Sequence, residues 1–194
     1  AVVAISRAAS FPLPDAGHRY LAAMVVTADP SVNRVFHSPG EHSLSVEEFG
    51  SPYVALAIRI LVDPADPADV AAVGVLQDAI ELRSASAVPF EMPDYDTASF
   101  DETRSALLTL AGRMTGFERT FGRADEVDPV RHLLGTAAGW GGLPTSEATY
   151  FGTNPRLPLG AYELTIGDVP VDGFWSISVY NAEGFFEPNA ADAY

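Results

Sequence analysis

The sequence predicts an α+β fold in which antiparallel sheets, packed as a β-sandwich or a jelly-roll-like arrangement, are separated by three helices in the middle of the chain. Up to residue 62, short apolar stretches alternate with turns rich in proline and glycine. From residue 67 to 138 the apolar residues recur at helical spacing, and beyond residue 142 the strand-like pattern returns. Strands, then helices, then strands again are typical of an α+β arrangement.

The amino-terminal part predicts a sheet built around one long apolar strand at residues 53–62, which we expect to be central because both of its faces are apolar. A second apolar run ends at Asp29-Pro30, and Ser38-Pro39-Gly40 separates the strands of a hairpin-like pair. Residues 11–17 contain two prolines, which disfavour regular pairing. The further predicted strands are residues 2–5, 19–27, 34–37 and 41–45.

Three helices follow. Asp66 and Pro67 begin the first, over residues 67–83, as N-cap and first helical residue. The second spans residues 97–114 and should bury Leu107, Leu108 and Leu110. Asp128-Pro129 begins the third, which ends in the glycines after Ala138. Beyond it, the predicted strands are residues 150–151, 161–166, 174–180 and 185–186, with a hairpin turn at residues 181–184.

The composition excludes several classes of function. The chain has 194 residues, eleven arginines, no lysine and 26 acidic residues, and its net charge of -15 would repel nucleic acid. Without cysteine it has no disulfide or thiolate metal site, and without lysine it has no Schiff base and no P-loop. Its apolar runs are shorter than the ~20 residues of a membrane span. No cofactor is indicated.

Four stretches carry a family resemblance: RILVDPADPADV at residues 59–70, LQDAI at 76–80, DPVRHLLGTAAGWGG at 128–142 and DVPVDGFWSISVYNAEGFF at 168–186. Together they resemble the paired bacterial families named domain of unknown function 1254, for residues 1–125, and domain of unknown function 1214, for residues 126–194. The resemblance implies β-rich domains, a further segment before the chain, further strands after it, and a periplasmic or secreted location. A cytoplasmic location stays open.

The predicted site centres on the third helix and the strand at residues 174–180. His132 lies in the first turn of that helix, where it could act as a general base, and Arg131 beside it could bind a ligand. The alternative is structural, with Arg131 paired to Asp125 or Asp128 and His132 packed against a strand. We expect Trp140 and Trp175 to line one shared hollow, with Arg131, Tyr180 and Asn181 as polar contacts.

Two further constellations are weaker. His37 and His42, with Glu41, Glu47 and Glu48, could hold a metal ion, but the spacing lacks a His-x-His pair, so solvated loop residues are favoured and no metal is predicted. Ser176 or Ser178 with His132 and Asp172 could form a hydrolytic triad, although no Gly-x-Ser-x-Gly elbow occurs.

Three interpretations of function follow from these residues. The first is a small-molecule binding or accessory protein of the bacterial envelope with an aromatic-lined pocket. The second is an esterase-like hydrolase with His132 as general base. The third is an assembly module that forms a homo-oligomer through exposed strand edges.

Overall fold

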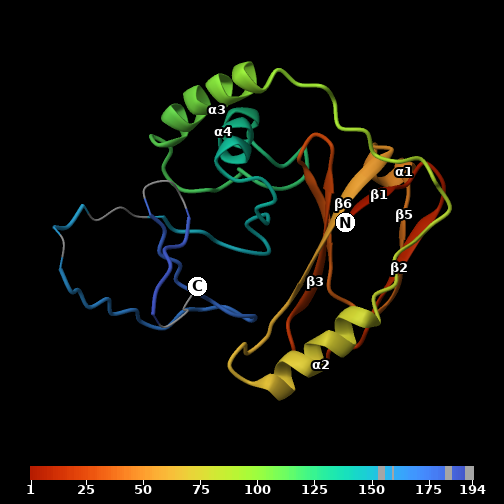
Figure 1. The fold of residues 1–194 in the computed structure, drawn as a ribbon, viewed down its shortest axis with the longest axis horizontal. Coiled ribbons are helices and arrows are strands. Elements are labelled where there is room, and N and C mark those ends of the chain that lie inside the picture. The colour runs from red at the N-terminus through yellow and green to blue at the C-terminus, as the bar shows by residue number, and fades with distance from the viewer. Residues whose placement is uncertain (153–155, 159, 182–184, 191–194) are drawn as a thin grey trace. The chain divides into compact units, whose positions relative to one another are not determined.

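The structure is a computed structural model that describes residues 1–152, 156–158, 160–181 and 185–190. It confirms the α+β class, because two antiparallel sheets are combined with four helices in the described residues (Figure 1). The chain divides into two compact units, Ala1–Pro155 and Arg156–Tyr194. All of the helices and strands of the described residues belong to the first unit.

The larger sheet has the strand order β1 (Val2–Ala4), β6 (Tyr53–Ile60), β3 (Leu21–Thr27) and β4 (Val32–Phe36). Every neighbouring pair is antiparallel, and Leu21 to Thr27 of β3 pair with Ile60 to Val54 of β6. All seven residues of β3 are buried, because both faces of this sheet are covered. The strand β6 lies between β1 and β3, which confirms the prediction of a central strand beginning at Tyr53.

The smaller sheet has the order β5 (Gly40–Leu44), β2 (Ala9–Leu13) and β7 (Arg83–Ser84). The prediction that prolines would keep the chain from pairing near Pro12 is wrong, since Pro12 lies inside β2 opposite Glu41. The strand β7 pairs only with Ala9 and Ser10, so β2 has an open side at Pro12, where a missing N–H is tolerated.

The main core lies between the two sheets. Phe11 of β2 is fully buried and meets Phe36 of β4 edge to face, with ring centroids 5.6 Å apart. Val25 of β3, Leu44 of β5 and Val54 of β6 belong to the same cluster. This is the packing of a β-sandwich, in which alternate residues of each strand face the partner sheet.

The other face of the larger sheet, called the outer face from here on, has its own small core. Met24, Val26 and Val32 are buried there against Leu143, which belongs to residues 139–150, called the covering segment. Gly141 of this segment has φ +79, a conformation that glycine adopts without strain. The predicted cluster of glycines around Trp140 is thus explained in part by a chain that turns closely over a sheet.

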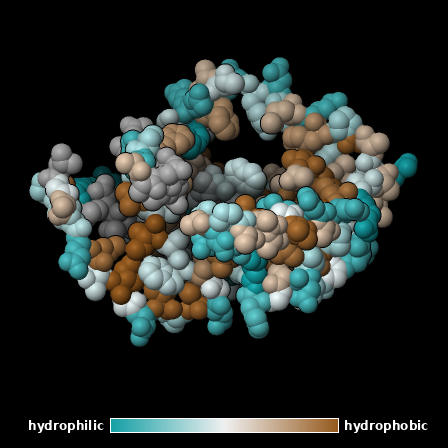
Figure 2. All heavy atoms as spheres, turned by 60° about the horizontal axis from the view of Figure 1, so that its bottom comes forward, coloured by the Kyte–Doolittle hydropathy of each residue, from teal (hydrophilic) through white to brown (hydrophobic). Residues whose placement is uncertain are grey.

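The helices α2 (Pro67–Asp78), α3 (Thr97–Ala111) and α4 (Pro129–Ala138) correspond to the three predicted ones, although α2 ends five residues before the predicted end at 83. A one-turn helix, α1 (Val46–Phe49), was not predicted; the Ser45 hydroxyl caps it, and Gly50 ends it in the left-handed conformation. Figure 2 brings α2 forward and shows hydrophobic and hydrophilic residues next to one another on that face.

The helix α3 differs from its prediction in burial. None of its residues is buried, and Leu107 and Leu108 are half-buried while Leu110 is exposed. It lies beside α4 (Figure 1), where Nε of Arg104 donates to the Ala137 carbonyl at 3.1 Å. The spacing of the apolar residues correctly predicted that α3 is a helix, but not how little of it is buried.

The predicted carboxy-terminal strands are wrong for the residues that the structure describes, since residues 150–151, 161–166, 174–180 and 185–186 contain no strand. Trp175, Ile177 and Val179, expected to form a core face, are exposed at 53%, 54% and 79%. Alternation favours a strand only where a partner and a core are supplied, and the second unit supplies neither to these residues. The turn predicted at 181–184 lies mostly outside the described residues, but the Asn181 N–H donates to the Phe185 carbonyl at 2.9 Å.

Candidate functional site

His132, the predicted general base, has both ring nitrogens directed at backbone carbonyls. Nδ1 lies 2.9 Å from the Thr120 oxygen and Nε2 lies 3.3 Å from the Asp29 oxygen. The imidazole thereby connects α4 to the turn at residue 120 and to the loop between β3 and β4. A general base needs a ring nitrogen within reach of a substrate proton. This geometry supports a positioning role for His132, and its catalytic role stays a prediction.

The Arg131 side chain is held against the loop that follows α3. Its Nη1 donates to the carbonyls of Thr115 and Gly116, at 3.3 and 3.5 Å, and lies 3.9 Å from the Glu118 carboxylate. The expected pairing with Asp125 or Asp128 is wrong: Asp125 pairs with Arg123 at 3.1 Å, and Asp128 caps α4.

Asp128 fills the place at which an external anion would bind the start of α4. Its Oδ1 accepts from the backbone N–H groups of Val130 and Arg131, both at 3.0 Å. These bonds lower the pKa of the Asp128 carboxyl, since they favour its charged form. The amino terminus of α4 is therefore satisfied from within the chain.

The predicted aromatic contacts are divided between the two units. Trp140 follows α4 in the first unit and is 61% exposed. Trp175, Tyr180 and Asn181 belong to the second unit, where Tyr180 stacks on Phe186 at 4.8 Å and Nδ2 of Asn181 donates to Glu187 at 2.9 Å. A hollow shared by Trp140 and Trp175 stays a prediction.

The histidines considered for a metal site have separate partners. Nε2 of His37 lies 2.7 Å from Oε2 of Glu147, while Nε2 of His42 lies 2.8 Å from the Ser38 carbonyl. Glu48 pairs with Arg34. In the described part of the chain, no three potential ligands come together in a way that could hold a metal ion.

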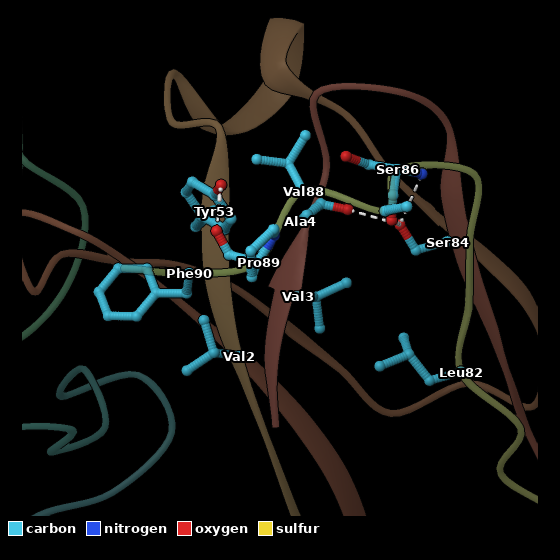
Figure 3. A pocket seen from close by; sticks show the side chains of 11 residues that line it. Val2, Val3, Ala4, Tyr53, Leu82, Ser84, Ser86, Val88, Pro89 and Phe90 are labelled. Atoms are coloured by element: carbon cyan, nitrogen blue, oxygen red, sulfur yellow. Dashed lines mark hydrogen bonds between the residues drawn. The ribbon is translucent and has the colours of Figure 1, made fainter. Parts of the chain in front are cut away.

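A groove that was not predicted lies along the free side of β1 (Figure 3). Its volume is about 300 Å³. The strands β1 and β7 are each the last strand of their sheet on this side, and here the sandwich is closed by side chains in place of a strand pairing. The Ser84 hydroxyl donates to the Ala4 carbonyl at 2.7 Å, and the hydroxyls of Ser6 and Ser86 lie 2.9 Å apart.

Most of the residues that line this groove are apolar, but backbone and hydroxyl groups supply more of its exposed surface than apolar atoms do. Tyr53 and Phe90 form its aromatic wall: their rings meet edge to face at 5.4 Å, and the Tyr53 hydroxyl donates to the Pro89 carbonyl at 2.9 Å. Figure 3 shows the Phe90 ring beside Val2, with Ser84 and Ser86 at the opposite end. The eleven lining residues are Val2, Val3, Ala4, Tyr53, Leu82, Ser84, Ser86, Ala87, Val88, Pro89 and Phe90.

Sequence reasoning did not find this groove, and none of the predicted site residues lines it. Its walls come from three segments far apart in the sequence, and no spacing motif connects them. Tyr53 and Phe90, 37 positions apart by number, became neighbours only because residues 82–90 return along β1.

Comparison with known proteins gives a likeness of fold. Neither the family models nor the curated proteins contain a match. Among solved structures, the chain is similar to the VPA0106 protein from Vibrio parahaemolyticus, with a TM-score of 0.61 and 14% sequence identity over 75% of this chain and 57% of that one. The chain thus spans somewhat more than half the length of that protein. The assignment to the two domain families and the location outside the cytoplasm stay predictions.

No helix in the described residues has the length and apolar character required to cross a membrane.

Proposed function

We propose that this chain is a binding protein for a small, uncharged and mostly apolar molecule, which occupies the groove between β1 and residues 82–90. The observation that carries the proposal is the lining: eight of the eleven residues are apolar, and the other three, Tyr53, Ser84 and Ser86, supply hydroxyls. Concave, mainly apolar sites with a few polar groups are typical of small-molecule binding. This keeps the interpretation of an aromatic-lined pocket but moves the pocket to other residues.

The volume of the groove limits the size of the ligand. An apolar cavity of roughly 150 Å³ accepts one benzene molecule. A groove of about 300 Å³ therefore suits a two-ring aromatic molecule or a short alkyl chain with one polar group.

The charges favour binding of a neutral molecule over catalysis. No histidine, carboxylate or arginine is among the lining residues, so the groove offers no ordinary general acid or base. The overall charge of -15 also disfavours an anionic ligand that lacks a cationic partner. A neutral ligand with one hydrogen-bonding group matches what Ser84, Ser86 and the neighbouring carbonyls present.

The test is a fluorescence titration of the whole chain with N-phenylnaphthylamine, a neutral two-ring probe. Phe90→Ala removes a ring that is 48% exposed and forms one wall. If the probe covers that exposed half, about 1 kcal/mol of binding is lost, which is about fivefold in Kd. Phe100→Ala is the matched control, because Phe100 is 56% exposed and lies on α3, away from the groove lining.

A second variant tests the volume directly. Val88→Trp adds bulk at an exposed lining residue, and we expect it to abolish saturable binding while the thermal melting of the chain is unchanged. If Phe90→Ala and Val88→Trp bind the probe as tightly as the wild type does, the groove is not the site and the proposal fails.

A further inference from the structure

Arg59 occupies a half-buried place on the outer face of the larger sheet. It lies on the central strand β6, opposite Ala22 of β3. Its Nη2 donates to the Gly141 carbonyl of the covering segment at 3.3 Å, and its Nη1 lies 3.8 Å from the sulfur of Met24. A guanidinium carries five N–H donors, and a thioether is a weak acceptor. Most of the donor capacity of Arg59 is therefore left for another partner.

The charge of Arg59 is not balanced by an ion pair within the described chain. Other arginines do form such pairs with carboxylates: Arg19, Arg34, Arg83, Arg123 and Arg131. In a protein with 26 acidic and eleven basic residues, carboxylates are abundant, yet none in the described residues forms an ion pair with this half-buried guanidinium. Taking a charge partly out of water is costly unless it is paired.

Glu147, the acidic residue of the covering segment, is already engaged. Its Oε2 lies 2.7 Å from Nε2 of His37, whose Nδ1 faces the Leu21 carbonyl at 3.3 Å. The His37–Glu147 pair joins the end of β4 to the covering segment and leaves Arg59 as the unmatched cation of the cluster.

Two phenol groups complete the surroundings. The Tyr150 hydroxyl accepts the Leu143 N–H at 3.1 Å, which leaves its own proton available to a further acceptor. The Tyr20 ring lies 5.9 Å from that of His37. Burial raises the pKa of the Tyr20 hydroxyl, and the Glu147 carboxylate adds to the rise while Arg59 opposes it. The Tyr20 phenol therefore stays protonated at neutral pH, close to Arg59 and Glu147.

We propose that Arg59, with the hydroxyl of Tyr150, forms a second binding site on the outer face that takes a small molecule bearing one carboxylate. A carboxylate matches the planar donor fork of arginine. A single charge is favoured because the chain as a whole repels anions of higher charge. The site does not depend on the groove, whose lining shares no residue with it.

The test is isothermal titration calorimetry of the whole chain with sodium benzoate, with neutral benzamide as the ligand control. The wild type should bind benzoate saturably and benzamide much more weakly. Arg59→Gln should weaken benzoate binding about tenfold or more, because a charge-assisted pair is lost. Arg113→Gln is the control variant: Arg113 is exposed, and its loss changes the net charge equally.

Two further variants keep the result interpretable. Tyr150→Phe should weaken benzoate binding less than Arg59→Gln does, and Phe90→Ala should leave it unchanged while weakening the neutral probe. If benzoate does not bind the folded wild type saturably, or if Arg59→Gln and Arg113→Gln weaken it equally, no specific site exists at Arg59. Failure of the neutral probe to bind would overturn the proposed function but not this site.

Discussion

Gly135→Ala should destabilise the protein. In a chain that also carries Thr120→Ser, the same Gly135→Ala substitution should instead stabilise it. Gly135 lies in α4 against Thr120, which is fully buried. A Cβ added at Gly135 would stand 2.1 Å from Cγ2 of Thr120, far closer than two carbon atoms can approach. Because the Thr120 side chain is short, β-branched and enclosed, it cannot turn aside as a long exposed side chain would.

Two opposing terms decide the outcome. Overpacking of this kind costs about 1–3 kcal/mol, whereas replacing glycine by alanine inside a helix gains about 1 kcal/mol. The net effect of Gly135→Ala alone is thus a loss of up to about 2 kcal/mol. Serine at position 120 lacks the methyl group that clashes, so in that background only the helical gain remains, and Gly135→Ala should stabilise by about 1 kcal/mol.

The assay is urea unfolding of the wild type, both single variants and the double variant, which forms a double-mutant cycle. We expect a coupling free energy of about 1–3 kcal/mol between positions 120 and 135. Thr120→Ser alone should cost about 1 kcal/mol for the lost methyl group. If Gly135→Ala has the same effect in both backgrounds, the close approach of α4 to Thr120 is not real and the reasoning is refuted.

Two further predictions concern the core and the link between β3 and α2. Phe11→Ala should lower the free energy of unfolding by about 3–5 kcal/mol, because Phe11 is fully buried between the sheets; a loss below about 1 kcal/mol in urea unfolding would contradict that packing. Hydrogen bonds from Arg19 and from the Asp63 N–H lower the pKa of the Asp69 carboxyl to about 2. The contribution of Asp69 to stability is therefore fully present above its unfolded pKa of about 3.9, and it is lost as the pH falls through about 2. Asp69→Asn should therefore lower the urea midpoint at neutral pH and flatten its decline between about pH 4 and pH 2, and an unchanged decline would count against the Arg19–Asp69 link.

The elements predicted most accurately are those that depend on residues close together in the sequence. Asp66-Pro67 and Asp128-Pro129 gave the starts of α2 and α4 to the residue, because a cap depends on the side chain and the next few N–H groups. The long apolar run from Tyr53 was correctly predicted as central. Here the apolar composition indicated the position of the strand within the sheet but not the depth of its burial, since only Val54 and Leu56 of β6 are buried.

The errors share a physical cause, namely that pairing and burial are set by distant residues. Pro12 was taken as a breaker, but β2 tolerates it because β7 ends before reaching it. Leu110 has helical spacing in α3 and is still exposed, since spacing defines a stripe but not what covers it. The two sites were missed for the same reason: the groove joins β1 to residues 82–90, and Glu147 reaches His37 across 110 positions.

The strand β6 supplies a residue to each proposed site and fixes their separation. Tyr53 and Arg59 are six residues apart on it, and an extended strand rises about 3.3 Å per residue, so their backbones lie about 20 Å apart. A ligand that fits a groove of about 300 Å³ is too short to reach both. Substitutions at sites so far apart should add independently. Hence the double variant Phe90→Ala/Arg59→Gln should bind the neutral probe as Phe90→Ala does and benzoate as Arg59→Gln does. Any coupling between the two effects would mean that one of the two ligands has been assigned to the wrong site.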